Sequence, residues 1–243
     1  MYHPESVPGQ YEIVTGPLPP VEVADALFFT REIITQVAAK HGLHATFAPR
    51  PFMSSAGSST HGHISVHSTA SEKVPGTLSP HESAFVAGVL DHVRAFAALT
   101  MPTAASYKRM VDGVWSGGTY VCWGTENREA PVRLTNAMSP GSRNFEVRFI
   151  DGTSNPHLAL AGMFAAVLLA LKEMKPQALG ITKRMPLSIV EARESLEQDK
   201  ALIEVLGSDF VEKYSSVNHT LESLLNPPGE NEEQLLTRLV KYY

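Results

Sequence analysis

The sequence predicts an α+β or α/β layer structure with one hydrophobic core. Apolar residues make up 43% of the 243 residues and charged residues 19%, which are values typical of globular proteins. Long segments with helical periodicity alternate with short segments in which apolar and polar residues alternate, as they do in strands. No stretch has the composition of a linker, so residues 1–243 are expected to form a single domain.

Composition also narrows the classes of partner. The formal net charge of −5 gives no reason to expect nucleic acid or an anionic membrane surface as a partner. No apolar run approaches the length of a transmembrane helix, and the N-terminus lacks the pattern of a signal peptide. The single cysteine, Cys122, excludes an internal disulfide and fits a reducing compartment. A cytoplasmic location is therefore predicted.

A short strand and a long helix are predicted first. Residues 11–14 alternate as a strand does, with Glu12 facing away from Tyr11 and Ile13. A helix over about 21–40 ends before Gly42, because glycine is common just beyond a helix C-terminus, and a short strand over 43–48 follows. The apolar stripe of this helix is expected to comprise Ala24, Leu27, Phe28, Ile33, Ile34 and Val37.

Residues 50–68, rich in histidine, glycine and serine, are the first candidates for chemistry. Side chains two residues apart on a strand share a face, so one side would carry His61, His63, Ser65 and His67. Imidazoles and a hydroxyl beside a glycine-containing loop suit a metal ion or a phosphate group. The plain alternative is a surface strand with scattered histidines.

The remaining elements follow from caps and helix breakers. Ser79, Pro80 and Glu82 form the start of a helix with a capping box, which runs to about Thr100. Pro156 begins an apolar helix that runs to about residue 172. Between these helices, short strands are predicted over 120–123, 131–134 and 145–150. Residues 176–243 are predicted to be helical, with Ser188 capping one helix and Pro227 and Pro228 preceding the last.

Several predicted strands carry a charged residue that could take part in chemistry. The candidate metal ligands are Glu12, His61 and Glu146, and the candidate anion binders are Arg109, Arg128, Arg133 and Arg148. Carboxylates repel one another unless cations offset their charge, so the whole set indicates a divalent metal with a phosphorylated or carboxylated ligand. For Glu146 and Arg148 alone, the plain alternative is an ion pair on an exposed face.

Six short motifs, in unbroken order over about the first 175 residues, carry a resemblance to a known family. They are Glu5 with PGQYE at 8–12, ATF at 45–47 with PRP at 49–51, GS at 57–58 with HGH at 61–63, SYKR at 106–109, NRE at 127–129, and FEVRF at 145–149 with Asp151 and NP at 155–156. The sequence resembles the catalytic domain of the glutamine synthetase family. Trp123 and Gly124 before ENR at 126–128 make it most similar to the fungal proteins that fuse an amidohydrolase-like domain to a glutamine-synthetase-like one, the FluG type.

The resemblance implies a fold and a chemistry. The fold would be an N-terminally incomplete catalytic domain with an open, barrel-like sheet packed by helices. In the family, a carboxylate of glutamate attacks the γ-phosphate of ATP, and ammonia then displaces phosphate from the acyl phosphate; the partners would be glutamate, ammonia or another amine, and ATP. Two sites would take Mg²⁺ or Mn²⁺, one held by Glu5 and Glu12 and the other by His61 and Glu146.

The resemblance also implies roles for the remaining site residues. Arg128 and Arg148 would grip the phosphoryl oxygens and Arg133 the nucleotide phosphates, because guanidinium groups bind such oxygens in pairs. Arg109, Arg148 and the backbone of Gly57 would position the substrate. His63 and Ser65 would lie beside the nucleotide. The full-length parent protein is expected to be a homo-oligomer.

The chain also departs from the family pattern. Residues 112–118 lack the glutamate that usually takes a proton from ammonium, and Trp115 in this segment could form a different lid. Residues 54–56 lack the acidic and amide residues that usually precede Gly57. The family's upstream metal-binding glutamates and N-terminal β-grasp domain do not occur in this sequence. The isolated chain is therefore expected to be inactive, with an uncovered sheet edge.

Three hypotheses follow. The first is a carboxylate–amine ligase that uses ATP and a divalent metal. The second is a pseudoenzyme with a structural or developmental regulatory role, suggested by the missing loop glutamate. The third is a small metal-binding β-barrel that uses His61, His63 and His67; in that case, replacing Glu146 would leave metal affinity unchanged.

Overall fold

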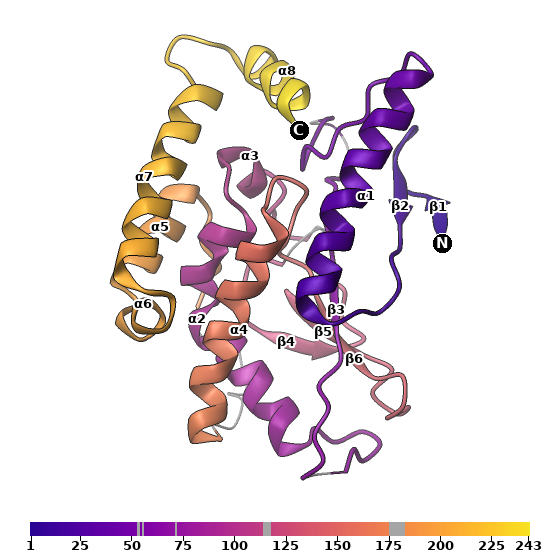
Figure 1. The fold of residues 1–243 in the computed structure, drawn as a ribbon, viewed down its shortest axis with the longest axis vertical. Coiled ribbons are helices and arrows are strands. Elements are labelled where there is room, and N and C mark those ends of the chain that lie inside the picture. Colours follow the sequence, from indigo (N-terminus) through magenta and orange to yellow (C-terminus); the bar gives the residue numbers. More distant parts are fainter. Residues whose placement is uncertain (53, 55, 71, 114–117, 175–182) are drawn as a thin grey trace.

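Two long helices pack against each other at the centre of the fold, α2 (Pro80–Thr100) and α4 (Pro156–Glu173) (Figure 1). The computed structural model describes residues 1–52, 54, 56–70, 72–113, 118–174 and 183–243. The helices approach closely through glycines: a Cβ on Gly88 would lie 2.5 Å from the Ala166 carbonyl oxygen, and one on Gly162 would lie 2.5 Å from Leu99. Both helices begin at the predicted proline, and α2 has the predicted capping box.

An open sheet of four strands lies against α2, in the order β3 (Gly62–Ile64), β6 (Asn144–Val147), β5 (Val132–Thr135) and β4 (Trp123–Thr125). Pairs β3–β6 and β6–β5 are antiparallel, and β5–β4 is parallel. Aromatic contacts join α2 to β6 and to the segment that follows it: the ring centroids of Phe85 and Phe145 lie 5.0 Å apart, and those of Phe96 and Phe149 lie 5.7 Å apart. Within the described residues, no strand pairs with the outer edges of β3 and β4, which confirms the predicted open sheet.

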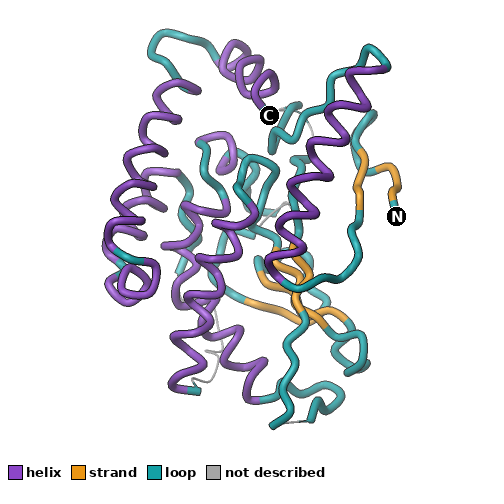
Figure 2. The backbone as a smooth tube through the Cα atoms, viewed as in Figure 1, coloured by secondary structure: helices purple, strands orange, loops and turns teal. Residues whose placement is uncertain are grey.

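A separate hairpin and a long helix form the N-terminal part of the chain. Among the described residues, strands β1 (Tyr2–Pro4) and β2 (Tyr11–Ile13) pair only with each other, and the long helix α1 (Pro20–Lys40) packs against α4 (Figures 1 and 2). The predicted apolar stripe of α1 is only partly buried, with Leu27 and Ile34 at intermediate exposure. Ala24 is its only buried residue, whereas Phe28, Ile33 and Val37 are 51%, 61% and 47% exposed.

The C-terminal helices cover the other side of the α2–α4 pair (Figure 1). They are α5 (Ile189–Gln198), α6 (Lys200–Leu206), α7 (Ser208–Leu225) and α8 (Glu232–Tyr242), and a short α3 (Ala104–Tyr107) follows α2. Ser188 caps α5, and Pro227 and Pro228 precede α8, as predicted. Asn231 completes a capping box at the start of α8.

Some predicted strand boundaries are wrong because distant backbone groups compete for the hydrogen bonds. Residues 43–48 form no strand, and Phe47 donates its amide to the carbonyl oxygen of Tyr243. The strand predicted over 120–123 begins only at Trp123, because Val121 pairs with Lys183 instead. The strand predicted over 145–150 ends at Val147.

The prediction that no segment approaches transmembrane length needs correction. By length and composition alone, α2 and α4 are both apolar enough to cross a membrane. The most apolar window of α2 is 72% buried inside the fold and that of α4 is 44% buried, so packing of the two helices accounts for much of this apolar character.

Candidate functional site

Three charged or polar side chains form a row across the sheet. Glu146 on β6 lies directly opposite Arg133 on β5 and His63 on β3 in the strand register. Phe145 and Val147, the neighbours of Glu146, are buried in the core, as the alternation of a strand requires. Glu146 therefore projects from the side of the sheet that turns away from α2.

Glu146 is the centre of this row because three cations or donors contact its carboxylate. Its Oε1 lies 3.0 Å from His61 Nδ1 and also accepts a hydrogen bond from Arg148, while its Oε2 lies 3.1 Å from Arg133 Nη1. Glu146 is 4% exposed and Arg148 is 6% exposed. The plain alternative, an ion pair on an exposed face, is therefore wrong for these two residues.

The surroundings of Glu146 keep it ionised. Burial raises the pKa of Glu146, but the hydrogen bond from His61 and the charge of Arg148 lower it, with a net pKa of about 2. Burial lowers the pKa of His61, and the hydrogen bond to Glu146 acts in the opposite direction. A neutral imidazole beside an ionised carboxylate is a donor set that suits a divalent transition metal.

His61 also has a buried nitrogen without a partner. Its Nδ1 faces Glu146, whereas its Nε2 is buried and has no hydrogen-bond partner among the described residues. Buried polar atoms in proteins are nearly always satisfied, so an orphaned imidazole nitrogen beside a carboxylate indicates a missing ligand. A metal at Nε2 would have Glu146 as the partner of its ligand through Nδ1, and a metal shared by His61 and Glu146 would have to replace the Nδ1–Oε1 contact. The two side chains together supply nitrogen and oxygen donors suited to a divalent metal.

A second cluster lies on the hairpin. One nitrogen of His3 and one carboxylate oxygen each of Glu5 and Glu12 lie within 4.8 Å of one another. Burial raises the pKa of Glu12, and its hydrogen bond and charge repulsion with Glu5 raise it further. Glu5 and Glu12 are thus brought together as predicted. His3 was missed, although its place directly opposite Glu12 in the hairpin follows from pairing residues 2–4 with 11–13.

The two clusters are neighbours. The charge of His63 lowers the pKa of both Glu12 and Glu146, so His63 lies within electrostatic reach of each. Gln10 on the hairpin loop donates a hydrogen bond of 2.9 Å to Ser58 Oγ, which ties the hairpin to the segment that leads into β3. The four predicted metal ligands therefore lie on adjoining elements.

Arg109 and Gly57 are also adjacent. A Cβ on Gly57 would lie 2.6 Å from the Pro49 carbonyl oxygen and 3.0 Å from Arg109 Cβ. Arg109 is 1% exposed; its Nη1 donates to Ser59 Oγ at 2.9 Å, and its Nε lies 3.7 Å from Asp151 Oδ2. In the sequence, Asp151 stands out only as part of the motif that begins at Phe145. Its position as the acidic partner of Arg109 could not be predicted from the sequence.

The other predicted residues occupy more exposed positions. Arg128 is exposed on the turn after β4, and its charge lowers the pKa of Arg148. His63 Nδ1 lies 2.9 Å from Asn144 Oδ1, and His67 Nε2 lies 2.9 Å from Ser65 Oγ.

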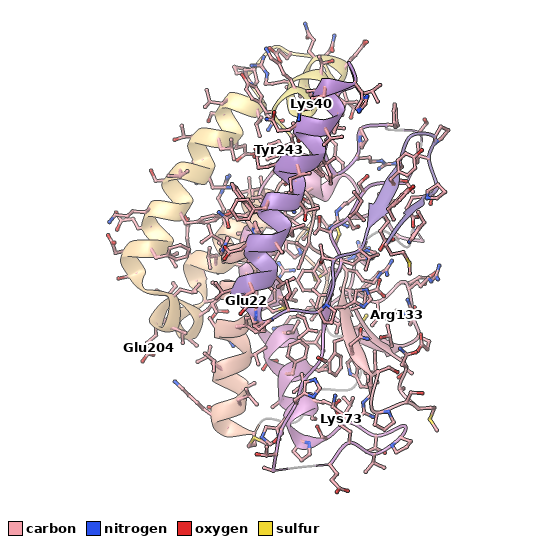
Figure 3. The ribbon with its side chains drawn as sticks, turned by 45° about the vertical axis from the view of Figure 1, so that its right-hand side comes forward. Glu22, Lys40, Lys73, Arg133, Glu204 and Tyr243 are labelled. Carbon is pink, nitrogen blue, oxygen red and sulfur yellow. The ribbon has the colours of Figure 1, made fainter. Side chains whose placement is uncertain are left out.

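Arg133 lies on the strand side of the molecule (Figure 3) and contacts Glu126 as well as Glu146. The predicted lid residue Trp115 and residue 55 of the 54–56 segment lie outside the described residues.

This arrangement contradicts the β-barrel hypothesis. The sheet is open, and His61 contacts Glu146, whereas His67 pairs with Ser65. The three histidines therefore do not form a group of ligands among the described residues, where the one set of at least three His, Cys, Asp or Glu side chains placed to hold a metal is His3, Glu5 and Glu12.

Comparisons with known proteins show what this chain is similar to. A sequence model of the catalytic domain of glutamine synthetase matches residues 1–225. The chain is 36% identical to Protein fluG of Emericella nidulans, over 94% of this chain and 27% of fluG. It is 34% identical to gamma-glutamylpolyamine synthetase GlnA3 of Streptomyces coelicolor, over 85% of this chain and 49% of GlnA3. It is 32% identical to the glutamine synthetase of Methanocaldococcus jannaschii, over 88% of this chain and 52% of that enzyme.

Solved structures show the same fold. A crystal structure of a glutamine synthase homologue superposes with a TM-score of 0.77 at 31% identity, over 90% of this chain and 54% of the homologue. A GmaS/ADP complex superposes with a TM-score of 0.82 at 27% identity, over 98% of this chain and 59% of that chain. The chain thus spans between 27% and 52% of the three curated relatives described above.

Proposed function

The chain belongs to the glutamine synthetase family, and on that premise we propose that it is the catalytic part of an ATP- and divalent-metal-dependent carboxylate–amine ligase. The reaction proposed joins the γ-carboxylate of glutamate to ammonia or another amine. The observation that carries the proposal is the ionised, nearly buried Glu146, held by His61, Arg133 and Arg148. The buried Nε2 of His61, which has no hydrogen-bond partner among the described residues, supports the proposal because it leaves a nitrogen of this cluster available to a ligand.

Two groups of residues would hold divalent cations, Mg²⁺ or Mn²⁺. Glu5 and Glu12 would bind one, and His61 and Glu146 the other. When bound, these ions supply positive charge that neutralises the triphosphate and polarises its oxygens. The chain's own contribution is to keep Glu146 ionised and to hold it in a fixed position between two guanidinium groups.

The arginines would serve the two anionic substrates. In the first step, a carboxylate oxygen of glutamate forms a bond to the γ-phosphorus of ATP, and the bond from that phosphorus to the bridging oxygen breaks, which releases ADP. Arg128 and Arg148 would stabilise the charge on the transferred phosphoryl oxygens, and Arg133 would hold the nucleotide phosphates. His63 and Ser65, exposed on and after β3, would contact the nucleotide.

In the second step, the amine nitrogen attacks the acyl carbon, inorganic phosphate leaves with its electron pair, and the nitrogen loses a proton. Arg109 and the Gly57 backbone would position the glutamate. Asp151 would hold the Arg109 side chain in position, because the two buried side chains form an ion pair. Residues 112–118 contain no glutamate to accept the proton, which favours an amine other than ammonia or a different base.

The alternative function is that of a pseudoenzyme with a structural or developmental regulatory role. The same absence of a glutamate from residues 112–118 favours it. The two functions differ in one property: a ligase releases phosphate from ATP when acid and amine are present, and a pseudoenzyme does not.

Isothermal titration with ATP and Mn²⁺, followed by a phosphate-release assay with glutamate and a panel of amines, tests the proposal. We expect nucleotide binding that requires the metal and is lost in Glu146→Gln. The assay is performed on this chain and on a homo-oligomeric full-length protein, because the chain spans only part of its relatives' length and we propose that it is inactive on its own. Binding without phosphate release by the longer protein supports the pseudoenzyme, and phosphate release by that protein refutes it. No binding of ATP and Mn²⁺ by either protein refutes the ligase.

A further inference from the structure

His3 lies among the carboxylates of the hairpin in a position suited to a metal ligand. It faces Glu12 directly across the β1–β2 pair, and Glu5 follows one residue after the end of β1. The ligand atoms of the three side chains lie within 4.8 Å of one another. Donors around a cation at about 2.1–2.4 Å are themselves separated by roughly 3 to 5 Å, so a small movement of the side chains suffices to close such a site.

The contacts of His3 are too long for direct hydrogen bonds to the carboxylates. Its Nδ1 lies 3.6 Å from Glu5 Oε1, and its Nε2 lies 3.7 Å from Glu12 Oε2. The imidazole therefore approaches both carboxylates without being hydrogen-bonded to either. All three side chains are partly exposed, between 38% and 47%, so an ion from solvent can reach them.

The two carboxylates also need a cation. One carboxylate oxygen of Glu5 and one of Glu12 lie within 4.8 Å of each other, and two carboxylates this close repel each other unless a positive charge offsets them. His3 lies directly opposite Glu12 in the hairpin, whereas His63 lies on β3 and contacts Asn144 through its Nδ1. His3 is therefore the side chain best placed to complete the group.

We propose that His3 is the third ligand of the cation at Glu5 and Glu12, which makes this site a nitrogen-containing one that prefers Mn²⁺, Co²⁺ or Zn²⁺ over Mg²⁺. Imidazole nitrogen binds first-row transition metals well, whereas Mg²⁺ favours oxygen donors alone. This inference rests on the proposed function, because it assumes that Glu5 and Glu12 hold a metal. It adds the ligand that determines which metal the site prefers.

The test uses Mn²⁺ and pulsed electron paramagnetic resonance, which detects the ¹⁴N nuclei of coordinated imidazoles. Because His61 is expected to ligate the other ion, the experiment compares the wild-type chain, His61→Asn, and the double variant His3→Asn/His61→Asn. His219→Ala, at an exposed histidine of α7, is the matched control. Circular dichroism of each variant verifies that it is folded.

We expect the ¹⁴N coupling to persist in His61→Asn and to disappear in the double variant, while His219→Ala resembles the wild type. We also expect His3→Asn to weaken Mn²⁺ binding roughly 10- to 100-fold, at least the loss typical of outer-shell partners. His3→Asp, which substitutes an oxygen donor, should retain Mg²⁺ binding and lower the preference for Mn²⁺ over Mg²⁺.

Two results overturn the inference while leaving the proposed function intact. One is the loss of all ¹⁴N coupling in His61→Asn while two Mn²⁺ ions still bind, which would mean that His3 is only an electrostatic neighbour. The other is persistence of the coupling in the double variant, which would assign it to His63 or another nitrogen. If neither the wild-type chain nor the full-length protein binds Mn²⁺, the proposed function fails together with the inference.

Discussion

Arg133 and Glu146 face each other directly across strands β5 and β6, with Arg133 Nη1 3.1 Å from Glu146 Oε2. The same guanidinium reaches Glu126 Oε2 at 2.7 Å through its Nη2. The strand register thus places one arginine between a nearly buried carboxylate and an exposed one. An anionic ligand that competes for Arg133 would displace Glu126 more easily than Glu146, because Glu126 is the more solvated partner.

Replacement of Glu146 by Gln should weaken metal binding at the His61 site. The variant keeps the size of the side chain but removes the charge that His61, Arg133 and Arg148 surround. We expect Mn²⁺ affinity at this site to fall at least tenfold in isothermal titration. Glu204→Gln on α6, on the opposite side of the molecule from Arg133 (Figure 3), is the control. An unchanged Mn²⁺ affinity in Glu146→Gln would refute the assignment of Glu146 as a ligand.

The same carboxylate should make stability depend on pH in the acid range. The pKa of Glu146 is about 2 in the folded chain and 4.5 without its surroundings. The unfolded chain therefore takes up the proton first as the pH falls. The stabilising effect is fully present above about pH 4.5 and is lost as the pH falls through about 2. The contribution of Glu146 to the free energy of unfolding is about 3 kcal/mol, because each unit of pKa difference between the folded and unfolded chain corresponds to about 1.36 kcal/mol.

Urea denaturation of the wild type and Glu146→Gln at several pH values between 6 and 2.5 measures this effect. The difference in unfolding free energy between the two proteins should shrink steadily below pH 4.5. A difference that is constant over this range would mean that Glu146 has an ordinary pKa in the folded chain.

A second buried ion pair should contribute strongly to stability without touching the site. Arg143 donates to both oxygens of Glu82, at 3.0 and 2.7 Å, and also to the carbonyl oxygens of Val74 and Thr77. Glu82→Gln keeps a side chain able to complete the capping box of α2 but leaves the arginine charge uncompensated. We expect a loss of about 3–5 kcal/mol in urea denaturation.

The control for this prediction is Glu232→Gln, which breaks the exposed pair with Lys108. That variant should unfold at nearly the wild-type urea concentration. If Glu82→Gln behaves in the same way, the pair with Arg143 is not a significant source of stability. Replacement of both partners by apolar residues, as in Glu82→Leu/Arg143→Met, should recover part of the loss.

Gly57→Ala should impair binding of the acid substrate. The added Cβ would collide with the Pro49 carbonyl oxygen and crowd Arg109, both part of the framework proposed to position glutamate. We expect the KM for glutamate to rise in the full-length protein while the Kd for ATP changes little. Gly141→Ala is the matched control, because a Cβ there has nothing within 4 Å. Equal effects of the two substitutions would refute a specific role for Gly57.

Local sequence was sufficient to predict most of the helices. The capping box of Ser79 and Glu82, the proline at the start of α4 and the cap at Ser188 each involve groups three or four residues apart. Such contacts form wherever the local sequence allows, so they can be read without knowledge of the fold. The alternation of residues 145–147 likewise predicted which side of β6 Glu146 occupies.

Only the tertiary structure decided how the site is assembled. The partners of Glu146 include His61, 85 positions earlier in the chain, and Arg109 pairs with Asp151 across 42 positions. The near-complete burial of these charges, the approach of His3 to Glu5 and Glu12, and the exposed apolar face of α1 depend on how distant elements pack. The sequence by itself determined the helices and the inventory of ligands and cations. The packing and the strand register determined which of them meet, because burial and ion pairing arise from contacts between segments that local patterns do not encode.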